Sequence, residues 1–281
     1  MRPERMVVAV DDEEPSALAV RWAAGRAATR PAEITLVTSV DLLLGDPEDE
    51  DARLDQLTAI VTRLAPSTPV TSSVIQQPIV EGLDEWTGNQ DLFVIGVHSA
   101  RRLLSVIAGA TPYRIAVSAN CPVVIVPSNW TARGGPVIVG LADDDSSQRA
   151  LLFAANEALL SSARLEIVHA GEDLTTPQGE PVGSARARRS VHRDRLHRAV
   201  DRVRAAFPLV QSTALLEQDG AVESLIRRSE TAGLIVLGTR RRTALSSAVL
   251  GSVARELIYG TLGAPIVVVA SGDSGAAAGI R

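Results

Sequence analysis

Short apolar runs alternate with longer amphipathic stretches along the whole chain. The apolar runs are rich in Val, Ile and Leu, which is typical of strands buried on both faces of a parallel sheet. They predict strands near residues 6–11, 33–40, 69–76, 91–97 and 122–127, then 136–142, 164–170, 209–216, 233–239 and 265–270. The amphipathic stretches predict helices near 15–29, 49–64, 79–89, 109–119, 146–161, 184–206, 220–230 and 250–260. This alternation indicates right-handed βαβ units and hence an α/β fold.

The same pattern occurs twice. Residues 91–127 align with residues 232–269, and two pairs of glycines fall opposite one another 142 residues apart, Gly96 with Gly238 and Gly109 with Gly251. Such repetition predicts a duplicated unit, and 281 residues are enough for two domains that each bury a core. We therefore predict two flavodoxin-like or Rossmann-like domains, each a five-stranded parallel sheet with helices on both faces. The predicted bounds are 1–128 and 136–270, with a linker at 129–135 and a flexible tail at 271–281.

Composition narrows the classes of function. A formal net charge of −5 and an aromatic content of 3% argue against a nucleic-acid partner, because neither attraction to phosphates nor base stacking is favoured. All 28 basic residues are arginine, which excludes chemistry that needs a lysine amine, such as a P-loop contact or a Schiff base. No apolar run approaches the ~18 residues that span a bilayer. We expect a cytoplasmic protein with no membrane partner, whose lone cysteine, Cys121, packs in the core.

The loops that follow the first and fourth strands of each half carry the candidate chemistry. In open α/β sheets, ligands bind at the carboxyl ends of the strands where the strand order reverses. The first strands run into VAVDDE at residues 8–13 and VGLADD at residues 139–144, and Ser16 and Ser147 follow. The fourth strands end at Gly96 and Gly238, and the last strands begin after a proline.

These segments resemble the universal stress protein family, over residues 6–127 and 136–270. The family combines an aspartate after the first strand with a G-x2-G-x9-G-S/T loop after the fourth. The resemblance implies non-catalytic adenine-nucleotide (ATP) binding in a stress response. The aspartate is implied to hold the adenosine end, and the loop to hold the phosphates and ribose. Glycines let the main chain approach phosphate oxygens, and N–H groups at a helix N-terminus complement the negative charge.

The two halves depart from the family pattern at different positions. The first half keeps Asp11, Gly96 and Gly109, with Ser99 at the second glycine and Ala110 at the closing hydroxyl. The second half keeps Gly238, Gly251 and Ser252, with Arg241 at the second glycine and Ala142 at the aspartate. The candidate nucleotide-binding residues are therefore Asp11, Gly96, Ser99, Gly109, Gly238, Arg241, Gly251 and Ser252. Arginines in both loops either replace lost phosphate contacts or form a solvated surface, so which half binds nucleotide stays open.

Other polar groups have two readings each. Acidic clusters at 11–14 and 143–145 either hold a magnesium ion beside the phosphates or cap the following helix. The four histidines form no ligand-like cluster in the sequence, and His98 is either a loop residue or a ligand contact. The segment 184–204 holds eight arginines beside a stripe of Val191, Leu196, Val200 and Val203, which predicts a helix with its arginines outward. These arginines form either a solvated face or a surface for an acidic partner.

We expect the two halves to pair as a pseudo-dimer, since the resemblance implies pairing through the last strands, 122–126 and 265–269. A further homodimer is left open. Two rival functions remain: a nucleotide-independent dimeric scaffold, motivated by Ala110, Ala142 and Arg241, and an adenylate-transferring enzyme of related fold. We expect no enzyme activity, because the sequence presents no lysine and no catalytic constellation.

Overall fold

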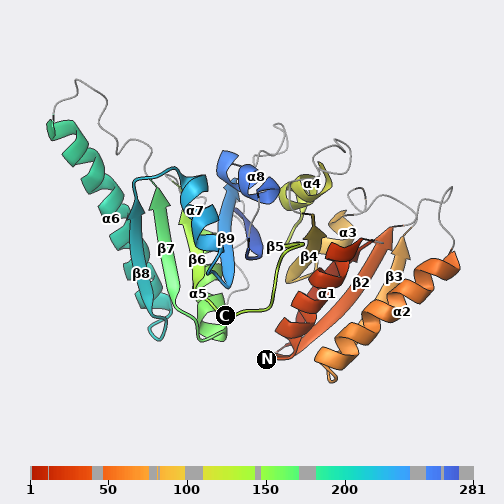
Figure 1. The fold of residues 1–281 in the computed structure, drawn as a ribbon. Helices are drawn as coiled ribbons and strands as arrows, with labels where there is room; N and C mark the ends of the chain where they lie inside the picture. The colour runs from red at the N-terminus through yellow and green to blue at the C-terminus, as the bar shows by residue number, and fades with distance from the viewer. Residues whose placement is uncertain are drawn as a thin grey trace. The chain divides into compact units, whose positions relative to one another are not determined.

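The computed structural model describes residues 2–11, 13–39, 47–75, 81, 83–98, 110–142, 147–170, 182–240, 251–260 and 263–271. The chain divides into two compact units, Met1–Ala132 and Arg133–Arg281 (Figure 1). The predicted linker at 129–135 contains the point of division. Residues 272–281, most of the predicted tail, lie outside the described residues.

The first unit is a parallel sheet with strand order β3-β2-β1-β4-β5. Its strands are β1 (Glu4–Val10), β2 (Ala32–Ser39), β3 (Val70–Ile75), β4 (Leu92–Val97) and β5 (Val123–Pro127). Its helices are α1 (Glu14–Ala27), α2 (Pro47–Leu64), α3 (Leu83–Thr87) and α4 (Ala110–Ser118). The strand order reverses between β1 and β4, so right-handed crossovers put α1 and α2 on one face and α3 and α4 on the other.

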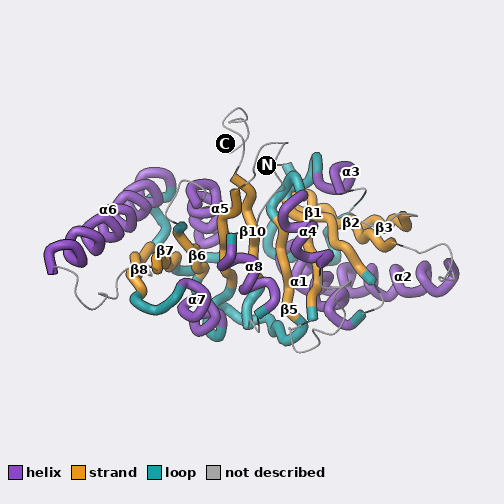
Figure 2. The backbone as a smooth tube through the Cα atoms, turned by 90° about the horizontal axis from the view of Figure 1, so that it is seen from above, coloured by secondary structure: helices purple, strands orange, loops and turns teal. Residues whose placement is uncertain are grey.

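The second unit repeats this topology with strand order β8-β7-β6-β9-β10. Its strands are β6 (Val137–Leu141), β7 (Leu165–Ala170), β8 (Ser212–Glu217), β9 (Leu234–Arg240) and β10 (Ile266–Ser271). Its helices are α5 (Ser147–Leu160), α6 (Val182–Ala206), α7 (Ala221–Ser229) and α8 (Ser252–Tyr259). In Figure 2, α5 and α6 lie on one side of this sheet and α7 and α8 on the other.

The predicted fold class is confirmed: both units are doubly wound α/β sheets. The helix expected over 79–89 is observed as α3, Leu83–Thr87, and it ends earlier than predicted because a turn follows it at 88–89. Residues 79, 80 and 82 of this prediction lie outside the described residues. One strand begins later than predicted, at Ser212, because residues 208–209 form a turn after Phe207. Among the described helices, none combines the length and the apolar character that crossing a bilayer requires.

Aliphatic side chains and alanine form the cores. The five residues of β5 are all buried, as expected for a strand covered on both faces. Helix α1 buries a face of small residues, Ala19, Ala23, Ala24 and Ala27, against the sheet. Cys121 is buried and forms no disulfide, as predicted. Arg26 binds the Glu4 carboxylate at 2.6 Å and thereby ties α1 to β1.

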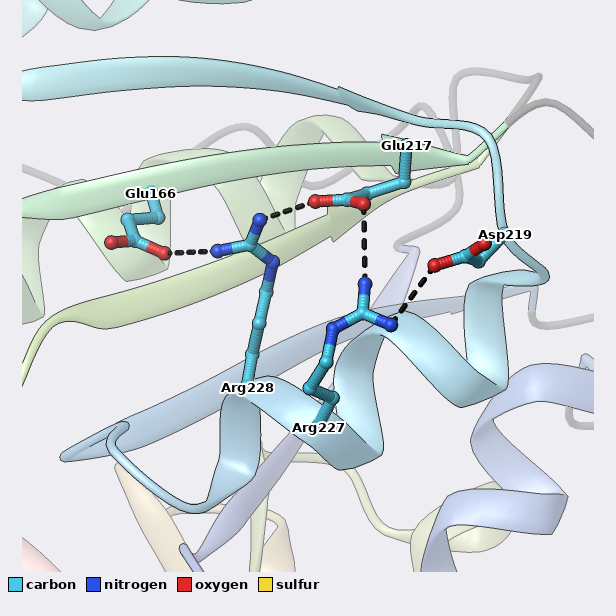
Figure 3. A network of polar contacts seen from close by, with 5 residues as sticks. All are labelled: Glu166, Glu217, Asp219, Arg227 and Arg228. Carbon is cyan, nitrogen blue, oxygen red and sulfur yellow. Dashed lines mark hydrogen bonds and ion pairs between the residues drawn. The ribbon is translucent and has the colours of Figure 1, made fainter.

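An ion-pair network fastens α7 to the second sheet (Figure 3). Arg228 of α7 contacts Glu166 of β7 at 3.0 Å and also pairs with Glu217 at the end of β8. Its neighbour Arg227 reaches Glu217 at 3.3 Å and Asp219 at 2.9 Å. Arg228, Glu166 and Glu217 are 16–24% exposed, whereas the Arg227 side chain is 55% exposed. The contacts of Arg228 are therefore better shielded from solvent than those of Arg227.

One residue of the apolar stripe predicted for α6 is not buried. Leu196, Ala199 and Val203 are buried, but Val191 is 57% exposed. The reason is the spacing along the helix. Val191 lies five residues before Leu196, outside the spacing of three to four, and the inward position of that turn holds His192, whose Nδ1 lies 2.6 Å from Nε2 of His169 in β7. The stripe is correct only from Leu196 onward.

Candidate functional site

In the first unit, Asp11 follows β1 and is held in one orientation. The hydroxyl of Ser16 donates to its carboxylate at 2.5 Å, and the backbone N–H of Glu13 donates to the same oxygen, Oδ1, at 3.0 Å. The Ser16 hydroxyl also accepts from the backbone N–H of Asp11 at 2.9 Å. The contact from Glu13 is an Asx turn, which fixes the chain before α1 begins. Asp11 thus presents an oriented carboxylate on an exposed loop.

The second unit has the same serine contact without the carboxylate. The Ser147 hydroxyl accepts from the backbone N–H of Ala142 at 2.8 Å. Ser16 and Ser147 are both buried, at 4% and 3% exposure. Ala142 therefore occupies the position of Asp11, and a methyl group stands where the first unit has its carboxylate. Both serines belong to the motifs recognised in the sequence, but no role was predicted for their hydroxyls.

The loops after β1 and β4 meet in the first unit. Ala9 and Ile95 are register partners, so the two strands end side by side. His98, directly after β4, bonds through Nε2 to the carboxylate of Glu13. His98, for which a loop position or a ligand contact was expected, thus has a protein partner 85 residues away along the chain. The Glu13 carboxylate does not cap α1, although Glu13 is its N-cap residue.

Gly96 lies inside β4 and is required by packing. A Cβ at this position would stand 2.1 Å from the carbonyl oxygen of Pro15, in the first turn of α1. No side chain larger than hydrogen fits there without moving the helix. The family resemblance implies a phosphate contact for this glycine, and the structure adds close helix–strand packing as a reason for it.

The remaining predicted site residues are placed as follows. Gly238 lies in β9 opposite Val269 of β10. Gly251 is the N-cap residue of α8 and has no side-chain cap, and Ser252 begins the helix with an exposed side chain. An uncapped helix start leaves N–H groups that can bind an anion. Ser99, Gly109 and Arg241 lie outside the described residues.

A polar cluster at the end of β2 fastens α2 in the first unit. Thr38 is 1% exposed, and its hydroxyl donates to the carboxylate of Glu50 and accepts from Arg53, both at 3.2 Å. Arg53 also pairs with Glu50. We call Thr38, Glu50 and Arg53 the first-unit clasp. Its carboxylate and guanidinium balance one another in charge.

The second unit has a different cluster at the equivalent positions. His169 pairs in register with Leu141, as Thr38 pairs with Val10. Nδ1 of His169 lies 2.9 Å from the carbonyl oxygen of Leu141, and Nε2 lies 2.6 Å from Nδ1 of His192 in α6. Arg195 donates to the carbonyl oxygen of Ala142 at 3.1 Å. We call His169, His192 and Arg195 the second-unit clasp.

This pair of histidines, 23 residues apart, was not predicted from the sequence. A signal was present in the duplication. Glu50 lies four residues before the buried Leu54, as His192 lies four residues before the buried Leu196. Aligning α2 with α6 by these leucines places His192 opposite Glu50 and Arg195 opposite Arg53.

The ends of the first strands of the two sheets have different polar neighbours. Among the described residues, Asp11 and Glu13 with His98 lie after β1, whereas Arg195 and the two histidines lie at the end of β6. A carboxylate suits the hydroxyl and amine donors of a nucleoside, and cations with free N–H groups suit phosphate. No group of three or more His, Cys, Asp or Glu side chains within the described residues could hold a metal ion. Asp12 and residues 143–145 of the acidic clusters lie outside those residues.

The two doubly wound sheets define a tandem α/β protein. Each unit has a candidate ligand site at the carboxyl edge of its sheet. The sequence model of the universal stress protein family matches residues 3–127 and 135–269. This chain belongs to that family and carries its domain twice.

Relatives of similar length are found in mycobacteria. A universal stress protein of Mycobacterium tuberculosis is 25% identical over 285 residues, covering 94% of this chain and 95% of the relative. One from Mycobacterium bovis is 23% identical over 286 residues, covering 94% and 96%. The crystal structure of a universal stress protein from Archaeoglobus fulgidus superimposes with a TM-score of 0.68 at 16% identity. That alignment covers 97% of this chain and 100% of the other, and it shows a shared fold.

Proposed function

We propose that this chain is a non-catalytic, adenine-nucleotide-binding protein of a cytoplasmic stress response, and that the first unit binds the adenosine end of ATP through Asp11. The observation that carries the proposal is the orientation of Asp11. Its Oδ1 accepts from Ser16 and from the backbone of Glu13. Among the described residues, the other oxygen, Oδ2, accepts no hydrogen bond. A carboxylate fixed in advance binds a hydroxyl or amine without first losing conformational freedom.

Calorimetry with ATP tests this assignment. Asp11→Ala removes the carboxylate and should weaken ATP binding about 10- to 100-fold, the usual effect of losing a hydrogen bond to a charged group. Asp11→Asn keeps an oxygen for Ser16 and Glu13 and should weaken binding less. Ser252→Ala, at the start of α8 in the second unit, is the matched control and should leave the affinity unchanged.

The reverse pattern, with Ser252→Ala harmful and Asp11→Ala silent, would move the site to the second unit. Mass analysis of small molecules released from gently purified protein provides an independent measurement, because tightly bound ATP should copurify. A magnesium requirement is tested by repeating the titration with a chelator present.

A nucleotide-independent scaffold is the second candidate, and two contacts favour it. In the second unit, the methyl group of Ala142 replaces the carboxylate beside Ser147. In the first unit, Glu13 is already bonded to His98 across the loops where a ligand would enter. Absence of bound nucleotide after purification, together with no heat of binding at millimolar ATP, would support the scaffold. Protein-dependent release of AMP or ADP, lost in Asp11→Ala, would instead indicate an enzyme.

The assembly remains a prediction. We propose that residues 122–126 and 265–269 pair the two units, as the family resemblance implies, and that two chains associate further. Native mass spectrometry of the purified chain measures the homodimer directly, and a purely monomeric spectrum would exclude it under those conditions.

A further inference from the structure

Strand β3 forms an edge of the first sheet, and one side of its main chain is unpaired. It is the last strand in the order β3-β2-β1-β4-β5, with β2 as its neighbour (Figure 1). Ile34 of β2 donates to the carbonyl oxygen of Pro69 and pairs in register with Val70, so the N–H and C=O groups of the odd-numbered residues in β3 point toward β2. Those of Val70, Ser72 and Val74 point outward and form no main-chain hydrogen bond with any described residue.

The segment around β3 lacks the features that normally keep a sheet edge from pairing. Soluble proteins protect such edges with charged side chains, proline or bulges. No charged residue occurs between Arg63 and Glu81. The strand itself reads VTSSVI, without proline or glycine and with mostly β-branched side chains, which favour strand pairing. The sequence therefore leaves this edge open to another strand.

Exposed apolar side chains lie at the same edge. Within the described part of the first unit, the exposed large apolar residues are Leu64, at the end of α2, and Val74 of β3, at 40% and 42% exposure. Val74 points to the face of the sheet that α2 covers, because its register partner Thr38 contacts Glu50 and Arg53 of α2. A further strand beside β3 would cover Val74 without displacing any described element.

The order of residues in β3 is self-complementary for antiparallel pairing. In an antiparallel pair, residues whose main-chain groups point outward lie opposite one another. When the pairing is centred on Ser72, Val70 of one copy lies opposite Val74 of the other, and Thr71 lies opposite Ser73. Apolar side chains then meet apolar ones, and hydroxyls meet hydroxyls, with no like charges opposed. Shifting the centre to Ser73 places Ser72 opposite Val74, which is a poorer match.

The corresponding edge strand of the second unit, β8, lacks this self-complementarity. A pairing of β8 centred on Ala214 places Ser212 opposite Leu216, a hydroxyl against an apolar side chain. The neighbouring helices differ as well. Exposed residues of α2 carry both signs of charge, such as Asp51 and Arg63. Among the described residues of α6, two exposed aspartates stand against five exposed arginines, Arg189, Arg193, Arg198, Arg202 and Arg204. Two copies of α6 on one face of a joined sheet would therefore repel each other.

We propose that β3 is a homodimer interface, through which two copies of this chain join their first sheets edge to edge and antiparallel, with the two-fold axis at Ser72. Each copy presents the same surface to the other, so the contact closes after two chains and does not extend into a fibre. Strand β5, proposed above to pair the two units, is the opposite edge of the first sheet, so the two pairings do not compete.

This interface rests on the association of two chains proposed above and gives that association a surface. It needs no bound nucleotide. A single strand edge makes a small contact, so the association should depend on protein concentration. The groups that hold it are main-chain N–H and C=O groups, which are the same in any extended strand, and the order of side chains in β3 favours a second copy of itself.

Ser72→Lys tests the interface in the full chain. Ser72 is exposed, so a single chain accepts the longer side chain, whereas a dimer opposes two like charges at its axis. Sedimentation equilibrium should show a dimer of the unaltered chain and a dissociation constant about tenfold higher or more in the variant. Thr213→Lys, at an exposed position of β8, is the matched control and should leave the association unchanged. Circular dichroism verifies that both variants are folded.

Cysteine pairing tests the register. Thr71 and Ser73 occupy positions between the hydrogen-bonded pairs, where side chains of antiparallel strands come closest. Mixing a Thr71→Cys chain with a Ser73→Cys chain under mild oxidation should give a mixed disulfide-linked dimer. Cys121 is buried and should not compete. Linkage of Ser73→Cys chains to one another in place of the mixed dimer would overturn the register centred on Ser72.

Three outcomes separate the interface from the proposals made above. A chain that is monomeric at its highest soluble concentration would overturn both the interface and the association, and would leave the edge to an extended segment of another protein. A dimer that Ser72→Lys does not weaken would overturn the β3 contact alone. Loss of ATP binding in Asp11→Ala with the dimer unchanged would support the interface as independent of the nucleotide site.

Discussion

The carbonyl oxygen of Pro15 stands 2.1 Å from the point where a Cβ on Gly96 would lie. This contact sets the distance between the first turn of α1 and β4. Because Asp11 and Ser16 flank that turn, the same contact fixes where the candidate carboxylate stands relative to the end of β4. The glycine is therefore needed for packing, whether or not a phosphate approaches the loop that follows.

Gly96→Ala should destabilise the protein by about 2 kcal/mol or more, because overpacking against a helix backbone forces the two elements apart. Gly25→Ala is the matched control: it lies in α1, where a Cβ meets nothing within 4 Å among the described residues. That change should stabilise by about 0.5–1 kcal/mol through helix propensity. Urea unfolding measures both, and an equal effect of the two substitutions would show that the Pro15 contact does not constrain the fold.

The two buried serines allow a comparison within one molecule. Ser147→Ala removes one hydrogen bond, to the backbone of Ala142, and should cost about 1 kcal/mol. Ser16→Ala removes the equivalent bond, from the backbone N–H of Asp11, and also the bond to the Asp11 carboxylate. It should cost about 2 kcal/mol. Thermal unfolding of both variants gives the comparison. A larger loss for Ser147→Ala would mean that the Asp11 contact contributes nothing.

The network in Figure 3 predicts unequal roles for neighbouring arginines. Arg228→Ala leaves Glu166 and Glu217 without their shielded cation and should cost about 2–3 kcal/mol. Arg227→Ala removes a pair in which the arginine is 55% exposed and should cost at most about 1 kcal/mol. Arg228→Lys should be intermediate, because an ammonium cannot bridge both carboxylates as a guanidinium does. Denaturation at low and high salt distinguishes the two pairs, since only the Arg227 pair should weaken strongly with salt.

Ala142→Asp should give the second unit the anchor that it lacks. The Ser147 hydroxyl stands where Ser16 stands beside Asp11, so it can orient the new carboxylate. If the first unit binds ATP through Asp11, this substitution should raise the calorimetric stoichiometry from one site toward two. Ala142→Asn is the uncharged control and should add less. An unchanged stoichiometry would show that the second unit needs more than the carboxylate.

Much of the architecture could be predicted from local patterns. Apolar runs and amphipathic stretches depend only on neighbouring residues, so the strands of both units and the doubled topology were predicted correctly. The apolar stripe of α6 was predicted wrongly at Val191. Val191 lies five residues before Leu196, and the position four residues before Leu196 holds His192, which contacts His169 of β7. A polar residue at a buried helix position cannot be recognised from the apolar pattern.

The candidate site was predicted less completely. Asp11, Gly238 and Ser252 were placed on the expected strands and loops, but their contacts were not foreseen. Asp11 was interpreted as a nucleotide anchor without the Ser16 hydroxyl that orients it. The second-unit clasp was not predicted, because its histidines belong to different elements.

The sequence by itself determined the α/β class, the duplication and the family, since these follow from periodicity and from motifs contiguous in the chain. Only the tertiary structure decided which side chains meet: Gly96 with Pro15, Glu13 with His98, and His169 with His192. The last two pairs are 85 and 23 residues apart. Their contacts depend on strand register and on how closely each helix packs, and the whole core sets both quantities together.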